Sequence, residues 1–119
     1  MSAKLAHRNW PVYLDALAFH DQVRIFLKSV PKGYADLVDQ IQRASNSIVL
    51  NISEGAGKFT TLDKRKFYLT ASGSAHECSG VIDLFKNAEV LTGEEHARMI
   101  DLLEKICGGL LGLTTSLTR

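Results

Sequence analysis

Apolar residues recur every three or four positions in four long segments of this chain, and short stretches rich in turn-forming residues separate the segments. Residues three and four positions apart lie on the same face of an α-helix, so this spacing predicts amphipathic helices. The expected helices span about residues 13–30, 34–55, 62–90 and 94–117. No segment shows the apolar and polar alternation that is typical of a β-strand. The pattern therefore predicts an all-α protein.

The separating stretches contain residues that end and begin helices. Pro31 and Gly33 end the first helix, and Gly55 and Gly57 end the second, because proline disfavours helical geometry in the preceding residue and glycine readily forms turns. The Thr-x-x-Glu sequence at 92–95 predicts a capping box for the fourth helix. Long helices joined by a few residues lie antiparallel to one another. We therefore expect a single domain, an up-down-up-down antiparallel four-helix bundle that spans residues 1–119.

The composition agrees with one folded domain. A length of 119 residues is close to the commonest domain size, and 45% hydrophobic with 23% charged residues is unlike a disordered chain. No apolar run reaches the length of about eighteen residues that spans a membrane, and the first residues lack the apolar core of a signal peptide. We expect a cytoplasmic protein with no membrane contact. Cys78 and Cys107 occupy apolar helical positions, which favours reduced thiols over a disulfide.

Each helix is expected to direct one apolar face toward a common core. In the first helix this face holds Tyr13, Leu17, His20, Arg24, Leu27 and Val30, with Ala16 and Val23 beside them. In the third helix it holds Phe67, Ala71, Ser74, Cys78, Val81, Phe85 and Ala88.

The third helix has a second stripe, roughly opposite the first, and the second helix has a comparable one. The stripe of the third helix holds Gly73, Glu77, Gly80, Leu84, Asn87 and Leu91. The stripe of the second helix holds Gln40, Arg43, Ser47, Leu50, Asn51 and Glu54. A solvated polar face is one interpretation. However, each glycine in the middle of a helix costs about 1 kcal/mol, which favours close approach of another backbone. We therefore expect a subunit interface, with Arg43 and Glu77 as a charge pair across it.

Four basic residues gather around the turn between the second and third helices: Lys58, Lys64, Arg65 and Lys66. The positive end of the third helix's dipole disfavours cations there, so a bound anion would relieve the repulsion. Repeated around a ring of subunits, these residues would form a basic rim able to bind a phosphate backbone. The alternative is a solvated cluster that Asp63 partly neutralises.

The sequence lacks the patterns of common catalytic and metal sites. No histidine belongs to a Glu-x-x-His pair, and no Cys and His grouping has zinc-site spacing. The Gly55-Ala56-Gly57-Lys58 stretch does not have the spacing of a phosphate-binding loop. We expect no catalytic residue, no metal and no cofactor.

Two stretches carry a resemblance to a known family: QIQRASNSIVLNISEGAGK at residues 40–58 and KFYLTASGSAHEC at residues 66–78. They resemble the four-helix-bundle proteins of the 23S rRNA intervening-sequence family, and the likeness extends over about residues 13–113. The positions that match the family pattern in the first stretch are Gln40, Arg43, Ala44, Ser47, Ile48, Asn51, Ile52, Glu54 and Gly55. The weaker second pattern includes Phe67, Ala71, Gly73, Ser74 and Glu77.

The resemblance implies a small helical subunit that assembles into a ring, typically a homopentamer, with no established enzymatic activity. It also relates the chain to the accessory proteins of diversity-generating reverse transcriptases, which bind nucleic acid. We therefore expect a non-enzymatic, ring-forming scaffold that contacts RNA or DNA through the basic rim. The alternative is an adaptor that binds another protein and has no nucleic-acid role.

Overall fold

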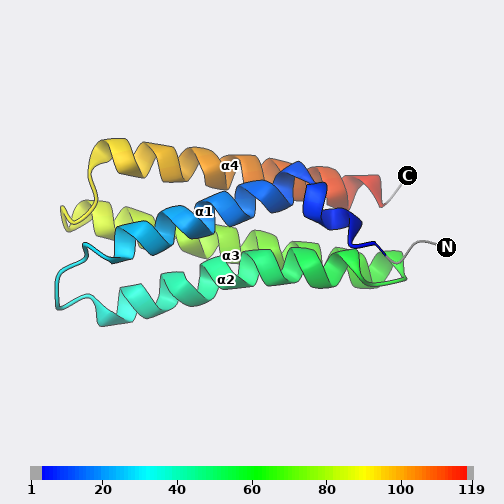
Figure 1. Ribbon diagram of the computed structural model, residues 1–119, viewed down its shortest axis with the longest axis horizontal. Coiled ribbons are helices and arrows are strands. Elements are labelled where there is room, and N and C mark those ends of the chain that lie inside the picture. Colours follow the sequence, from blue (N-terminus) through cyan, green and yellow to red (C-terminus); the bar gives the residue numbers. More distant parts are fainter. Residues whose placement is uncertain (1–3, 118–119) are drawn as a thin grey trace.

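The computed structural model describes residues 4–117, which form four α-helices and one short 3-10 helix. In chain order the elements are η1 (Ala6–Asn9), α1 (Pro11–Leu27), α2 (Ala35–Ala56), α3 (Thr61–Asn87) and α4 (Gly93–Ser116). The α-helices run alternately up and down in a bundle with extents of 50 × 24 × 21 Å (Figure 1). The predicted all-α four-helix bundle is confirmed.

The two ends of the bundle are built from different parts of the chain (Figure 1). The α2–α3 turn lies at one end, together with the first and last described residues. The α1–α2 turn and the α3–α4 turn lie at the opposite end. Within the bundle α2 packs against α1 and α3, and α4 packs against the same two helices; the contact between α2 and α3 is the most extensive.

A proline begins the first helix, and a second proline lies shortly after its end. Pro11 is its first residue, where a missing N–H costs nothing and the fixed φ suits a helix. The helix ends at Leu27 rather than near residue 30, because Pro31 disfavours helical geometry in the residue before it. The N–H groups of residues 28–30 donate to carbonyls three residues earlier, which tightens the last turn.

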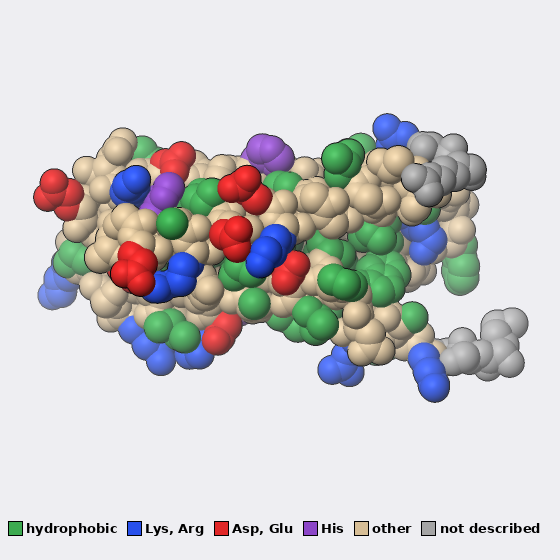
Figure 2. All heavy atoms as spheres, turned by 90° about the horizontal axis from the view of Figure 1, so that it is seen from above, with side chains coloured by type: hydrophobic (Ala, Val, Ile, Leu, Met, Phe, Trp, Pro, Cys, Tyr) green, Lys and Arg blue, Asp and Glu red, His purple; other side chains and the backbone are tan. Residues whose placement is uncertain are grey.

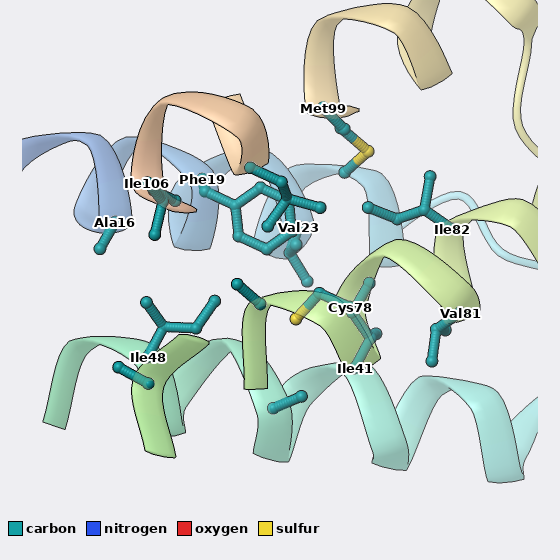
Figure 3. Packing of buried hydrophobic residues seen from close by; sticks show 14 of the residues in the cluster. Ala16, Phe19, Val23, Ile41, Ile48, Cys78, Val81, Ile82, Met99 and Ile106 are labelled. Atoms are coloured by element: carbon teal, nitrogen blue, oxygen red, sulfur yellow. The ribbon is translucent and has the colours of Figure 1, made fainter. Parts of the chain in front are cut away.

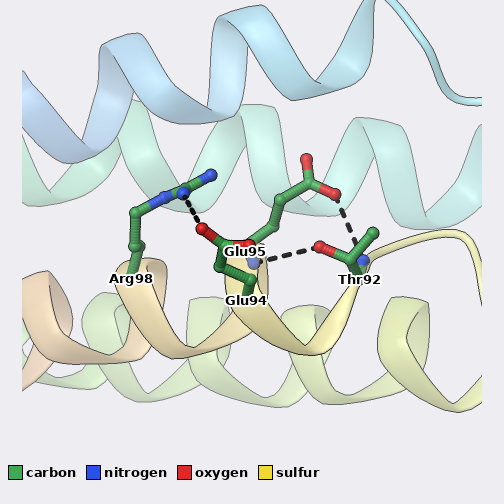
Figure 4. A network of polar contacts seen from close by, with 4 residues as sticks. All are labelled: Thr92, Glu94, Glu95 and Arg98. Atoms are coloured by element: carbon green, nitrogen blue, oxygen red, sulfur yellow. Dashed lines mark hydrogen bonds and ion pairs between the residues drawn. The ribbon is translucent and has the colours of Figure 1, made fainter.

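Side-chain caps begin α3 and α4. Thr60 Oγ1 accepts a hydrogen bond from the Asp63 N–H at 3.1 Å. The predicted capping box of α4 is confirmed: Thr92 Oγ1 accepts from the Glu95 N–H at 3.1 Å, and Glu95 Oε1 accepts from the Thr92 N–H at 3.2 Å (Figure 4). These bonds satisfy N–H groups that have no partner within a helix.

All four helices contribute to one buried cluster. In Figure 3, Phe19 of α1, Ile41 of α2, Ile82 of α3 and Ile106 of α4 point into the same interior. Toward the end with the α1–α2 turn, the ring of Phe26 meets the ring of Phe85 edge-on at a centroid distance of 5.2 Å. Other fully buried side chains are Ile48, Ile52, Leu110, Val23, Cys78 and Ser45.

The expected core face of α1 is wrong by one residue, although Ala16 and Val23, which were expected beside it, are buried as predicted. The buried residues are Val12, Ala16, Phe19, Val23 and Phe26. Five of the expected positions, at 13, 17, 20, 24 and 27, each lie one residue later, which corresponds to a rotation of about 100°. Leu17 is 41% exposed and Arg24 is exposed. The rotation places the two phenylalanine rings inside, and it moves His20 to the edge of the α1–α2 contact, where its Nε2 lies 2.8 Å from Asn46 Oδ1.

The expected core face of α3 is partly correct. Ala71, Cys78, Val81 and Phe85 are buried as predicted. Tyr68, Ala75 and Ile82 are buried as well, because α3 packs against both α2 and α4 and so buries a wider arc than one heptad seam. Ser74 and Phe67 are only partly buried, and Ala88 is exposed beyond the end of the helix. Leu91, which was expected on the second stripe, lies in the core with 3% exposure.

Two glycines allow neighbouring helices to approach closely. Gly55 lies inside α2 rather than ending it, and a Cβ built there would lie 2.6 Å from Cε1 of Tyr68 on α3. A Cβ built on Gly109 of α4 would lie 2.7 Å from Cβ of Val12 on α1. In contrast, a Cβ on the neighbouring Gly108 would meet no atom within 4 Å.

No described helix is long and apolar enough to cross a lipid bilayer.

Alanine substitution of Gly109 and Gly108 should have opposite effects on stability. Gly109→Ala forces an atom against the stiff, branched Val12 side chain, and overpacking of this kind costs about 1–3 kcal/mol. Gly108→Ala adds a side chain in open space and gains up to about 1 kcal/mol of helix propensity. Urea unfolding followed by circular dichroism measures both. Equal stabilities of the two variants would contradict the close approach at Gly109.

Candidate subunit and nucleic-acid interfaces

The residues expected at a subunit interface lie along the outside of two adjacent helices. Those that are exposed are Gln40, Arg43, Leu50 and Glu54 of α2, and Gly73, Glu77, Gly80 and Leu84 of α3. Ser47 and Asn51 are half-buried. We call these residues together the α2–α3 outer face.

Ser47 and Asn51 have partners within the subunit. The hydroxyl oxygens of Ser47 and Ser74 lie 2.8 Å apart and join α2 to α3. Asn51 Nδ2 donates to the carbonyl oxygen of Ser47 at 2.8 Å and to its hydroxyl at 2.9 Å. The Ser47–Ser74 contact therefore joins the two helices beneath the more exposed residues, and Asn51 supports it by its bond to the Ser47 hydroxyl.

Gly73 and Gly80 have no close neighbour within the chain. A Cβ built on either residue would meet nothing within 4 Å. Glycine in an exposed helix interior costs about 1 kcal/mol relative to alanine. At Gly55 the Tyr68 ring explains the absence of a side chain, whereas no described residue explains it at Gly73 or Gly80.

The proposed charge partners Arg43 and Glu77 are not paired with each other within the subunit. Arg43 Nη2 lies 3.0 Å from Asp39 Oδ2, one turn earlier on α2. Among the described residues, Glu77 makes no ion pair of 4 Å or less. An exposed pair one helical turn apart contributes only about 0.3–0.5 kcal/mol, so Arg43 can exchange partners at little cost. The pair across a subunit interface stays a prediction.

The four basic residues of the α2–α3 turn differ in their surroundings. Lys64 Nζ donates to the carbonyl oxygen of Ala56 at 3.0 Å, and so helps to cap the C-terminus of α2. Lys58 Nζ lies 5.0 Å from the ring centre of Phe67, a cation–π contact. Arg65 and Lys66 are exposed.

The fold adds two basic residues that the sequence patterns did not single out. The segment Lys4–Trp10 lies against the last turn of α2, where Lys4, His7 and Trp10 line a hollow of about 190 Å³ with Ser53 and Gly57. This contact places Lys4 near the end of the bundle that holds the α2–α3 turn, and Arg8 follows it in η1. Periodicity gave no signal for them, because they precede the first amphipathic helix.

Basic residues therefore outnumber acidic ones at one end of the bundle. We call the end that holds Lys4, Arg8, Lys58, Lys64, Arg65 and Lys66 the basic end. The carboxylates closest to it along the chain are Glu54 and Asp63. On the face seen in Figure 2, acidic and basic side chains are mixed over the half that holds the α1–α2 and α3–α4 turns, and no acidic side chain is visible at the basic end. A long polyanion would meet less repulsion at the basic end than elsewhere.

Both cysteines are free thiols with weakened acidity. Burial, together with the nearby charge of Glu77, raises the pKa of Cys78 to about 12. Burial and the charge of Glu104 also raise the pKa of Cys107, which is half-buried. At neutral pH both stay protonated and are poor nucleophiles.

Among residues 4–117, no three His, Cys, Asp or Glu side chains come together to hold a metal ion.

Comparison with protein families identifies the group to which this bundle belongs. The model of the 23S rRNA-intervening sequence protein family matches residues 8–112. The chain belongs to this family. The match includes the whole of α1, α2 and α3 and most of α4. Comparison with the curated proteins finds no match.

In this family member, the matching positions on α2 serve two surfaces. Ala44, Ile48 and Ile52 are buried in the core. Arg43 and Glu54 are exposed on the α2–α3 outer face. The same stretch of helix therefore determines both how the bundle packs and what it presents outward.

Thiol labelling should distinguish the two cysteines. With a pKa of about 12, roughly one Cys78 thiol in ten thousand is ionised at pH 8, and the core also blocks access. In a Cys107→Ser variant, Ellman's reagent should therefore react with Cys78 only after unfolding in guanidinium. A Cys78→Ser variant reports Cys107 alone, which should react slowly in the native protein. Rapid native labelling of Cys78 would contradict its burial.

Proposed function

We propose that this protein is a non-enzymatic scaffold that self-associates through the α2–α3 outer face and binds RNA or DNA at the basic end. The observation that carries the nucleic-acid role is that four basic residues surround the α2–α3 turn, and that the segment with Lys4 and Arg8 lies against the last turn of α2. Phosphate backbones bind such surfaces with release of counterions. Two free cysteines fit a reducing compartment, and we place this function in the cytoplasm.

Self-association is supported by what the α2–α3 outer face leaves exposed. Leu50 is 60% exposed and Leu84 is 51% exposed. Gly73 and Gly80 leave open space beside them. Helices from neighbouring copies would bury both leucines and use the space above the glycines.

The proposed contact is head to tail. The α2 row of one copy meets the α3 row of the next, and contacts between two different surfaces form a ring when the rotation closes. In a ring about an axis along the bundles, all basic ends point to the same side. Several weak phosphate sites then act together on one nucleic acid, which raises the overall affinity. The resemblance implies five subunits.

Side chains at the two open glycines should break the assembly and leave the bundle intact. Gly73→Gln with Gly80→Gln adds atoms where the isolated subunit has room, but blocks a second backbone. Light scattering after gel filtration should find a multiple of 13.1 kDa for the wild type, about 65 kDa for five chains, and 13.1 kDa for the variant. Gly108→Gln, also in open space, is the matched control and should keep the wild-type mass. A wild-type mass of 13.1 kDa at micromolar concentration would overturn the assembly.

Charge reversal at the basic end should abolish nucleic-acid binding. Arg8→Glu, Arg65→Glu and Lys66→Glu are combined, because Lys58 and Lys64 have contacts within the chain. Fluorescence anisotropy with labelled RNA should show wild-type binding that weakens steeply between 50 and 200 mM salt, and a loss of at least about tenfold in the variant.

The matched control reverses three exposed lysines at the opposite end, Lys28, Lys32 and Lys86, with the same change in net charge. Its affinity should stay within about threefold of the wild type. Equal losses in the two variants would show that only net charge matters and would overturn the site. Absence of wild-type binding at 50 mM salt would favour the adaptor that binds another protein.

A further inference from the structure

A fully exposed aromatic ring stands at the tip of the basic end. Phe59 lies in the turn between α2 and α3 and is 100% exposed. The two aromatic residues that follow it at the start of α3 already have partners. The Phe67 ring lies under Lys58, and Tyr68 is buried against Gly55. Phe59 therefore presents an aromatic surface that no described part of the subunit covers.

The turn that carries Phe59 is held on both sides. The Gly57 and Lys58 N–H groups donate to carbonyls of the last turn of α2. The side chain of Thr60 caps α3, and Lys64 Nζ reaches across from α3 to the carbonyl of Ala56. An aromatic ring displayed from a fixed turn loses little conformational freedom on binding.

Basic residues lie on both sides of Phe59 in the sequence. Lys58 precedes it, and Arg65 and Lys66 follow in the first two turns of α3. Proteins bind single-stranded nucleic acids by combining cationic groups that follow the phosphates with aromatic rings that stack on bases. In a duplex the base faces are already stacked, so a protruding ring reaches only unpaired bases.

We propose that the basic end recognises single-stranded nucleic acid, with Phe59 stacked on an unpaired base and Arg65 and Lys66 on adjacent phosphates. This inference rests on the proposed function and narrows it to one class of nucleic acid. A lipid surface is the competing partner, because Leu62 is also 77% exposed. The single strand is favoured because one ring suffices for stacking, whereas the neighbours Thr60, Thr61 and Asp63 interrupt the continuous apolar surface that insertion needs.

The test compares a labelled 20-nucleotide oligo-U strand with a hairpin duplex of the same number of phosphates at one salt concentration. The wild type should bind oligo-U about tenfold more tightly than the duplex. Phe59→Leu keeps an apolar side chain but removes the aromatic face, and should lower oligo-U affinity about tenfold with duplex affinity unchanged. Leu62→Ala is the matched control and should change neither affinity. A Phe59→Trp variant should retain binding, and its added fluorescence should be quenched by oligo-U.

The outcomes separate this inference from the proposed function. Three results together would overturn stacking but leave the nucleic-acid role in place. The wild type would bind strand and duplex with equal affinity, Phe59→Leu would not change the affinity for oligo-U, and the charge-reversal variant would bind neither. If the wild type binds neither oligo-U nor the duplex, both this inference and the proposed nucleic-acid role are overturned. Sedimentation with vesicles containing 30% phosphatidylserine tests the lipid surface. Binding to vesicles that Phe59→Leu preserves and Phe59→Ala abolishes, without preference for oligo-U, would show apolar insertion instead.

Discussion

The close contact between α2 and α3 determines most of what this protein presents to its surroundings. Tyr68 lies where a side chain on Gly55 would be, and the hydroxyls of Ser47 and Ser74 meet at 2.8 Å. These contacts fix how far each helix is rotated and shifted against the other. A rotation by one residue, about 100°, would carry the core side chains outward and the outer face inward. The core and the proposed subunit interface therefore depend on the same register.

The helices were predictable from the sequence because their boundaries have local causes. Capping threonines, Pro31 and the spacing of apolar residues act within a few positions, and they gave the helix order and the fold. The rotation of α1 was not predictable in this way. Leu14, Leu17 and Ile25 are apolar but each at least 41% exposed. The helix therefore has apolar residues on more than one face, and their spacing does not determine which face is buried. The volume of the phenylalanine rings decides between them, and that depends on the other three helices.

The candidate sites were predictable in part for a similar reason. Lys58, Lys64, Arg65 and Lys66 are close in sequence, so their clustering at the α2–α3 turn follows from the turn itself. Their individual roles do not, because the carbonyl that Lys64 contacts and the ring beneath Lys58 are placed by the packing of α3 on α2. The contribution of the segment Lys4–Trp10 to the basic end depends on its contact with the last turn of α2, more than forty residues away in the chain.

The tight packing of Val12 against Gly109 joins the beginning of the chain to a point near its end. During translation, the N-terminal segment emerges first, but α1 can settle into its final place only after α4 has left the ribosome. Until α4 is available, α1 lacks one of the two helices against which it packs. The surface that we propose for polyanion binding would therefore be complete only once all four helices are in place.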